Sequence, residues 1–255
     1  MSINSEYIGK NSLENIKYIA KEKNFEKILI FAGKKSFLES GAKSQLNSIL
    51  SKFQYEVFYK INKLPDIMDL KKFILKINDY KPSLIIAIGG GAVLDLAKVS
   101  NSLYKCKDLE DNIKKSSYEL NHFCELIAIP TTAGSGAETT SNAVIYVNKI
   151  KYSIEGSNIK PKYYFLIPSL LKNLKKNIKA SSGFDAISQS IESVFSKKST
   201  KQSIKFAIDS LKLSIANLAD FVKKPNNQNS FNMSYAAMLS GRAINISRTI
   251  APHAV

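Results

Sequence analysis

The segment GFDAISQSIES (183–193) carries a carboxylate and an amide at a spacing that could serve a metal ion. Asp185 and Gln189 are four positions apart, so on a helix both side chains lie on one face. A carboxylate in such a pair often belongs to a metal site, yet its partner here is an amide and not an imidazole. Three interpretations stay open from these residues: a metal site, a degraded metal site, or the polar first turns of a helix.

Two glycine-rich loops point to a second kind of chemistry. In LIIAIGGGAVLDLAK (84–98) an apolar strand leads into Gly89–Gly91 before a helix, and IPTTAGSGAETT (129–140) places Gly134 and Gly136 after another apolar strand. Bare backbone at such points lets a phosphate approach the N–H groups of a helix N-terminus. Nucleotides bind at loops of this kind at the carboxyl ends of parallel strands. A plain tight turn explains the first loop alone, but the two loops together predict a nucleotide site.

The elements that must position these residues follow from the hydrophobic pattern. Segment 143–154 is typical of a hairpin or a kinked pair of strands. Other short apolar runs predict strands at 27–33, 55–61, 84–90, 125–132 and 162–168. Because amphipathic stretches separate the first three runs, we expect a parallel, doubly wound, Rossmann-like sheet.

The pattern changes at Pro168. Beyond it, apolar residues recur at helical spacing through 169–223, are interrupted at 223–230 and then resume. We therefore expect an α/β nucleotide-binding domain over residues 1–168 and an all-α domain over 169–255.

Composition narrows the class of protein. The chain is 44% hydrophobic and 23% charged, which is typical of a globular protein, and it shows neither a secretory signal pattern nor an apolar run of membrane-spanning length. We expect a cytoplasmic location and no membrane partner. The net charge of +16 comes from lysines scattered through every segment, since Arg242 and Arg248 are the only arginines. Without a clustered basic stripe or a nucleic-acid-binding motif, we expect no nucleic-acid partner.

Four motifs occur in order along the chain: GGGAVLDLAK, IPTTAGSGAETT, GFDAISQSIES and GRAINISRTIAPHAV. Together they resemble the signature motifs of the iron-containing (group III) alcohol dehydrogenase family over essentially the whole chain. The forms DAISQSIES and NISRTIAPHAV look most like its phosphonoacetaldehyde reductase branch. The resemblance implies a dehydroquinate synthase-like architecture, in which a nucleotide-binding α/β domain precedes an all-α metal-binding domain. Because the chain stops before the family's last ligand histidine, we expect a C-terminally truncated chain with an incomplete helical domain.

The resemblance also implies NAD(P)H as the cofactor. Matching positions are Gly90, Gly91, Ala92, Val93 and Leu94 along the pyrophosphate with Asp95 close by, Thr131, Thr132, Ala133, Gly134 and Ser135 in a second wall, and Lys151 as a cofactor-contacting lysine. Gly33 stands where relatives often carry an aspartate that holds the ribose 2′-hydroxyl. Its absence, beside Lys34 and Lys35, would suit NADPH, but two merely exposed lysines explain the pattern equally, so NAD and NADP both stay open.

For a metal, the resemblance implies three positions in this chain. Asp185 and His253 match family ligands, whereas Gln189 replaces a histidine. An amide oxygen is a weaker donor than imidazole for a borderline divalent ion. We therefore expect Fe²⁺ or Zn²⁺ to bind weakly, and contact with substrate or a metal-bound water is the alternative role for Gln189.

The implied reaction is hydride transfer between nicotinamide and an alcohol or aldehyde carbon, with the metal ion as Lewis acid. Within the branch, the substrate would be phosphonoacetaldehyde and the product 2-hydroxyethylphosphonate. Arg242 and Arg248 are candidate ligands of the phosphonate, because guanidinium groups bind oxyanions bidentately; a surface ion pair is the alternative for each. No residue can be named as the catalytic proton donor.

Other functions stay open. They are an alcohol dehydrogenase acting on another small alcohol or aldehyde, a glycerol-1-phosphate dehydrogenase or dehydroquinate synthase-like enzyme, and a non-catalytic nucleotide-binding fragment. The form PTTAGSGAETT counts against the second of these. The sequence leaves the oligomeric state open, a homo-oligomer included.

Overall fold

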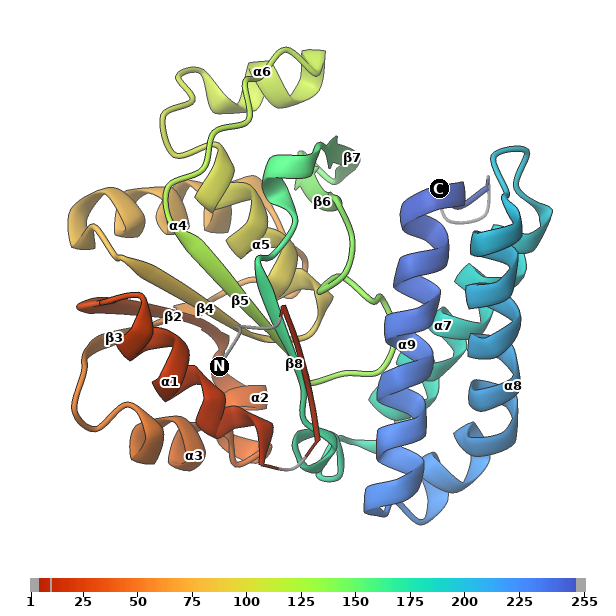
Figure 1. The fold of residues 1–255 in the computed structure, drawn as a ribbon. Helices are drawn as coiled ribbons and strands as arrows, with labels where there is room; N and C mark the ends of the chain where they lie inside the picture. Colours follow the sequence, from red (N-terminus) through yellow and green to blue (C-terminus); the bar gives the residue numbers. More distant parts are fainter. Residues whose placement is uncertain (1–4, 10, 251–255) are drawn as a thin grey trace.

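The strands form one parallel sheet and a separate hairpin. In the computed structural model, which describes residues 5–9 and 11–250, six strands lie in the order β1-β8-β5-β4-β2-β3 and each neighbouring pair is parallel (Figure 1). Strands β6 (Asn142–Val147) and β7 (Ile150–Glu155) pair antiparallel. The sheet strands are β1 Glu6–Ile8, β2 Lys27–Gly33, β3 Gln54–Lys60, β4 Leu84–Gly89, β5 Glu125–Pro130 and β8 Tyr163–Leu166.

Helices cover both faces of the sheet, because successive residues of a strand point to opposite faces. On one face Leu29 and Phe31 of β2 pack with α4 (Ile67–Tyr80) and α5 (Gly91–Ser102). On the other face Ile28 and Ile30 pack with three short helices, and a further short helix follows α5 before β5 (Figure 1). These short helices are α1 Asn15–Glu22, α2 Lys34–Glu39, α3 Ala42–Ile49 and α6 Leu109–Lys115. The doubly wound α/β fold is therefore confirmed.

Three long helices follow the last strand and pack against one another beside β8 (Figure 1). They are α7 Lys176–Phe195, α8 Lys201–Lys223 and α9 Asn227–Ser247, and single 3₁₀ turns lie at Ser12–Glu14, Ser157–Ile159 and Pro168–Leu171. Helix α8 ends at Lys223, and Asn226 then caps α9 by accepting from the backbone N–H of Asn229. The interruption expected at 223–230 is this change of helix.

Helix α7 exposes a stripe of large apolar side chains. Phe184, Ile191 and Phe195 recur at spacings of seven and four, so they lie on one side of the helix, and Phe195 is 74% exposed. Ile208 and Ile215 form a similar pair on α8. Among the described residues, no helix combines the length and the apolar character that crossing a lipid bilayer would require.

The structure departs from the sequence expectations at two points. Strand β1 was not expected; its three residues are too few to show an alternating pattern, and it pairs at the sheet edge with β8. Of the two alternatives expected for segment 143–154, the structure shows the hairpin. The strand expected at 125–132 ends at Pro130, because the chain turns away after Thr131 donates to the carbonyl of Gly89.

Candidate functional site

The first glycine loop joins β4 to α5. Gly90 is the N-cap of α5, and the first N–H groups of a helix lack intrahelical partners. Val93 and Leu94 are buried in the core, and their backbone N–H groups donate to the carbonyl of Gly90, so neither offers a ligand a side chain or a free N–H group. The carboxyl end of β4 thus presents backbone donors at a helix N-terminus, as predicted from the sequence.

The second loop follows β5 and faces the first. A Cβ atom on Gly91 would lie 2.7 Å from Ser135 Oγ, so the two loops approach closely. Thr131 Oγ1 is buried and has no hydrogen-bond partner among the described residues, whereas Ala133 packs into the core. Glycine is required at 136, where φ is +60° and a Cβ would lie 2.5 Å from the carbonyl oxygen of Ala237 on α9. A cradle without side chains and an unpaired buried hydroxyl fit a bound phosphate group.

A pocket of about 350 Å³, here called the central pocket, opens beside these loops. It collects residues from α5, the second loop, the β6–β7 hairpin, α7 and the end of α9. Five predicted site residues line it together: Asp95, Ser135, Lys151, Gln189 and Arg248. Segments far apart in the sequence therefore converge on one cavity next to the glycine loops.

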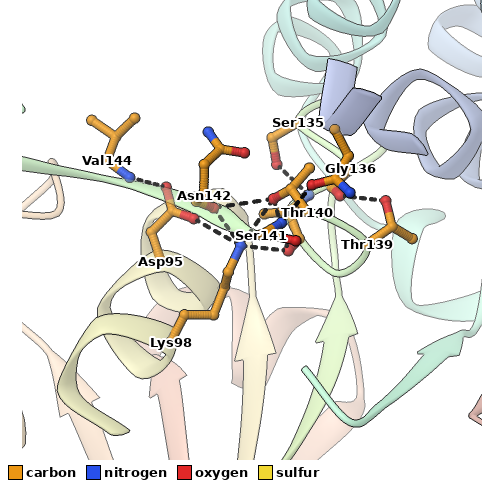
Figure 2. A network of polar contacts seen from close by, with 11 residues as sticks. Asp95, Lys98, Ser135, Gly136, Thr139, Thr140, Ser141, Asn142 and Val144 are labelled. Carbon is orange, nitrogen blue, oxygen red and sulfur yellow. Dashed lines mark hydrogen bonds and ion pairs between the residues drawn. The ribbon is translucent and has the colours of Figure 1, made fainter. Parts of the chain in front are cut away.

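Buried charges support one side of the central pocket (Figure 2). Asp95 Oδ2 accepts from the backbone N–H of Val144 at 3.1 Å, and Lys98 Nζ lies 4.0 Å from Asp95 Oδ1. Burial raises the pKa of Asp95 to about 6 against the opposing effect of Lys98. Burial also raises the pKa of Glu138 to about 7 and lowers the pKa of Lys98 to about 8. Asp95 thus lies in the wall of the pocket, and Lys98 and Glu138 are buried behind it.

A second pocket of about 630 Å³, here called the β2-end pocket, is lined by Gly33, Lys34, Lys35 and Lys60 among others. Gly33 ends β2, and a Cβ on it would lie 3.6 Å from Val93 Cγ2 at the start of α5. This position next to the first glycine loop suits the adenosine end of a dinucleotide. Lys34 and Lys35 are exposed, and Lys35 pairs with Glu39 at 3.8 Å.

The candidate metal ligands are only partly gathered. Gln189 Nε2 donates to Asp185 Oδ2 at 3.3 Å, and Gln189 Oε1 accepts from Ser240 Oγ at 3.2 Å. His253 lies outside the described residues. Within residues 5–9 and 11–250 no group of three or more His, Cys, Asp or Glu side chains could hold a metal ion. The donors in this part of the chain therefore do not by themselves fit a metal ion.

The two arginines lie in different places. Arg248 caps the end of α9 with φ +63°, and its Nη2 contacts Glu155 Oε2 at 2.8 Å. Its Nη1 is buried without a hydrogen-bond partner among the described residues. Arg242 instead pairs with Glu6 and donates to the Tyr164 hydroxyl at 2.8 Å.

Arg242 lines a third pocket of about 460 Å³ together with Lys160 and Lys162. The two candidate phosphonate ligands therefore lie in different pockets, and Arg242 forms an ion pair with Glu6. Arg242 lies within α9, whereas Arg248 follows its last residue with φ +63°, so the helical repeat does not align the two side chains.

Sequence reasoning missed several residues of the site. Lys98, Glu138 and Asn142 form the buried network behind the central pocket, and Glu155 pairs with Arg248. A usable signal for Lys98 is its place in the apolar run LDLAKV, three positions after Asp95, where a helix puts both on one face. Glu155 left no comparable signal, because it lies in the exposed edge of a hairpin.

Comparisons with known proteins find relatives that are similar to this chain in sequence and in fold. The chain is 28% identical over 244 residues to an alcohol dehydrogenase of Thermococcus barophilus, covering 92% of this chain and 64% of that protein. It is 30% identical over 186 residues to a phosphonoacetaldehyde reductase of Streptomyces viridochromogenes, covering 69% of this chain and 47% of that protein. The solved structure of a sulfoacetaldehyde reductase of Bifidobacterium kashiwanohense in complex with NAD⁺ matches with a TM-score of 0.90 and 27% identity, covering 98% of this chain and 67% of that one.

The chain thus spans less than two thirds of the length of the curated relatives that it matches. The model of one family, described as iron-containing alcohol dehydrogenase, matches residues 4–168, which is more than half of the chain. With the paired glycine loops and the shared fold, this match shows that the chain belongs to the iron-containing alcohol dehydrogenase family.

Proposed function

We propose that this chain takes part in the NAD(P)H-dependent reduction of an aldehyde to an alcohol. The observation that carries the proposal is the close approach of the two glycine loops, at the carboxyl ends of β4 and β5, beside the central pocket. Two such loops at adjacent parallel strands suit a dinucleotide, with its pyrophosphate at the N-terminus of α5.

Each part of the site has a proposed role. The backbone N–H groups at Gly90 and Gly91 bind the pyrophosphate, and the β2-end pocket takes the adenosine end. The central pocket takes the nicotinamide end and the aldehyde, which brings the reacting carbons together. Bound there, the cofactor supplies the hydride to the carbonyl carbon. A metal ion, Fe²⁺ or Zn²⁺, and the division of the chain into residues 1–168 and 169–255 remain proposals.

For the substrate we favour an aldehyde that carries an oxyanion, such as phosphonoacetaldehyde. Arg248 supports this choice, since its guanidinium lines the central pocket with one nitrogen unpartnered among the described residues, and Lys151 adds a second cation. Two of the relatives named above act on aldehydes with a phosphonate or a sulfonate group. An acidic group in this pocket would form charge-assisted hydrogen bonds with Arg248.

The test combines binding with turnover. NADH and NADPH are titrated into the purified chain by fluorescence, and reduction of phosphonoacetaldehyde is compared with reduction of butanal. We expect binding of at least one nicotinamide cofactor and a higher kcat/KM for the phosphonate. Failure to bind either cofactor would overturn the proposal.

Cofactor binding without turnover of any aldehyde would favour the second candidate, a non-catalytic nucleotide-binding protein. That candidate is favoured by the lack of a three-ligand metal group among the described residues.

A further inference from the structure

Lys98 is a fully buried lysine on α5 whose ammonium group is surrounded by oxygen atoms. Its Nζ donates to the carbonyl of Ala137 at 3.0 Å, to Thr140 Oγ1 at 2.9 Å and to the carbonyl of Asn142 at 2.5 Å. An ammonium carries three N–H donors and no acceptor, so three acceptors satisfy it. A neutral amine would have only two donors, so one of these three contacts would be lost.

The three acceptors belong to one segment, residues 137–142, which connects the second glycine loop to β6 (Figure 2). Figure 2 shows Lys98 reaching from α5 to the inner side of this segment. The segment forms few backbone hydrogen bonds of its own, and its carbonyl groups at Ala137 and Asn142 accept from both Lys98 Nζ and Thr140 Oγ1. Lys98 therefore links α5 to the second loop by hydrogen bonds.

The other side of the segment is tied to the long helices. Ser141 donates its backbone N–H to Asn245 Oδ1 of α9 at 2.7 Å, and Thr139 Oγ1 lies 3.5 Å from the carbonyl of Met238. Since α5 also begins at the first glycine loop, Lys98 connects the first loop, the second loop and α9. Movement of the segment would change the spacing of the loops, which is so small that a Cβ atom on Gly91 would lie 2.7 Å from Ser135 Oγ.

We propose that Lys98 is a positioning residue of the cofactor site: its buried ammonium holds the two glycine loops at the spacing that a dinucleotide requires and lies 4.0 Å from Asp95 Oδ1 at the wall of the central pocket. An apolar residue of similar length would fill the same space without the cost of burying a charge. The oxygens around Nζ and the nearby carboxylate account for a lysine at this position. This inference rests on the proposed cofactor site.

The charges that face this network come from four elements. Asp95 on α5 and Glu138 in the segment attract the ammonium, Lys160 repels it, and Arg242 of α9 acts on Glu138. Lys98 opposes the rise that burial causes in the pKa of Asp95 and of Glu138. Loss of the ammonium should therefore raise the pKa of both carboxyl groups further.

The experiment uses Lys98→Met, which keeps the length of the side chain and removes the charge. NADH affinity is measured by fluorescence titration, and urea unfolding is followed from pH 5 to 8. We expect the Kd for NADH to rise by about tenfold or more, as for loss of charge-assisted hydrogen bonds that position a site. In the wild type, the free energy of unfolding should fall as the pH rises through the pKa values of Asp95 and Glu138. In Lys98→Met this fall should occur at higher pH, because both pKa values are raised further, and a packing role alone would not produce this shift.

Lys43→Met is the matched control, because Lys43 is an exposed lysine on α3, which packs on the opposite face of the sheet from α5, and the change removes the same charge. It should leave unchanged both the affinity for NADH and the pH range over which the free energy of unfolding falls, here called the pH window. If Lys98→Met does not fold, Thr140→Val removes one acceptor of the ammonium and Thr140→Ser keeps it. Val should then weaken NADH binding and Ser should not.

A folded Lys98→Met variant with wild-type Kd and an unchanged pH window would overturn the inference, as would equal behaviour of the two Thr140 variants. If the wild type binds no nicotinamide cofactor, the proposed function fails. The pH window then still decides whether Lys98 controls the charge of the carboxyl groups.

Discussion

Gly90 at the end of the first loop lies so close to Thr132 of the second that a Cβ atom on Gly90 would be 3.4 Å from both the methyl and the hydroxyl of the threonine. The backbone at Gly90 has φ −77° and ψ 177°, which any residue can adopt. Glycine is thus needed at this position for access to the backbone and not for conformation.

Gly90→Val should therefore fold normally and lose the cofactor. The branched side chain fills the gap between the loops, and we expect NADH affinity to fall by about tenfold or more, which is ~1.4 kcal/mol. Titration with NADH and urea unfolding, run on the same preparation, check both parts. Unchanged NADH affinity in a folded variant would refute the assignment of the cofactor site.

Arg248→Met tests the anion contact. The loss of one charge-assisted interaction costs about 1.5–3 kcal/mol, so KM for phosphonoacetaldehyde should rise by roughly 10- to 150-fold, whereas KM for butanal should change little. Arg242→Met is the matched control, because Arg242 pairs with Glu6 and Tyr164 away from the central pocket. Equal losses on both aldehydes would assign Arg248 a structural role through Glu155.

Glu138→Gln should change how stability depends on pH. Burial raises the pKa of Glu138 from 4.5 to about 7, so the folded state binds this proton more tightly than the unfolded state. The resulting stability is present below pH 4.5 and is lost as pH rises through about 7. Urea unfolding between pH 4.5 and 7.5 should show a smaller fall for the variant. A fall as steep as in the wild type would mean that Glu138 does not titrate in this range.

Gln189→His tests whether α7 carries a latent metal site. The imidazole would lie four positions from Asp185 on the same helix face, where Gln189 already contacts the carboxylate. Imidazole is a stronger donor than an amide for Zn²⁺, so we expect tighter Zn²⁺ binding in competition with a chromophoric chelator. Gln189→Asn is the control, and Zn²⁺ affinity equal in the two variants would count against a metal site at this position.

The sheet could be predicted because its information is local. Strands β2 and β4 are apolar runs that end at glycine. Each can be recognised as a strand from its own residues, without knowing which strands pair with it. The pair Asp185 and Gln189 was equally predictable, since a spacing of four places two side chains on one helix face. Strand β1 was not, because its three residues owe their extended form to pairing with β8, far along the chain.

The composition of the pockets was decided by tertiary structure. Asp95, Lys151 and Arg248 come from three elements that meet only when the hairpin and α9 pack near α5, and no spacing in the sequence encodes that distance. Arg242 lies within α9 and pairs with Glu6 near the other end of the chain, whereas Arg248 follows the last residue of the helix and lines the central pocket. Lys98 shows the same limit: its type and its helix face are visible in the sequence, but its partners lie about forty positions ahead and are brought to it by the fold. Local sequence therefore determined the elements and the glycine loops, whereas long-range packing decided which charges share a cavity, because burial and contact depend on the whole chain.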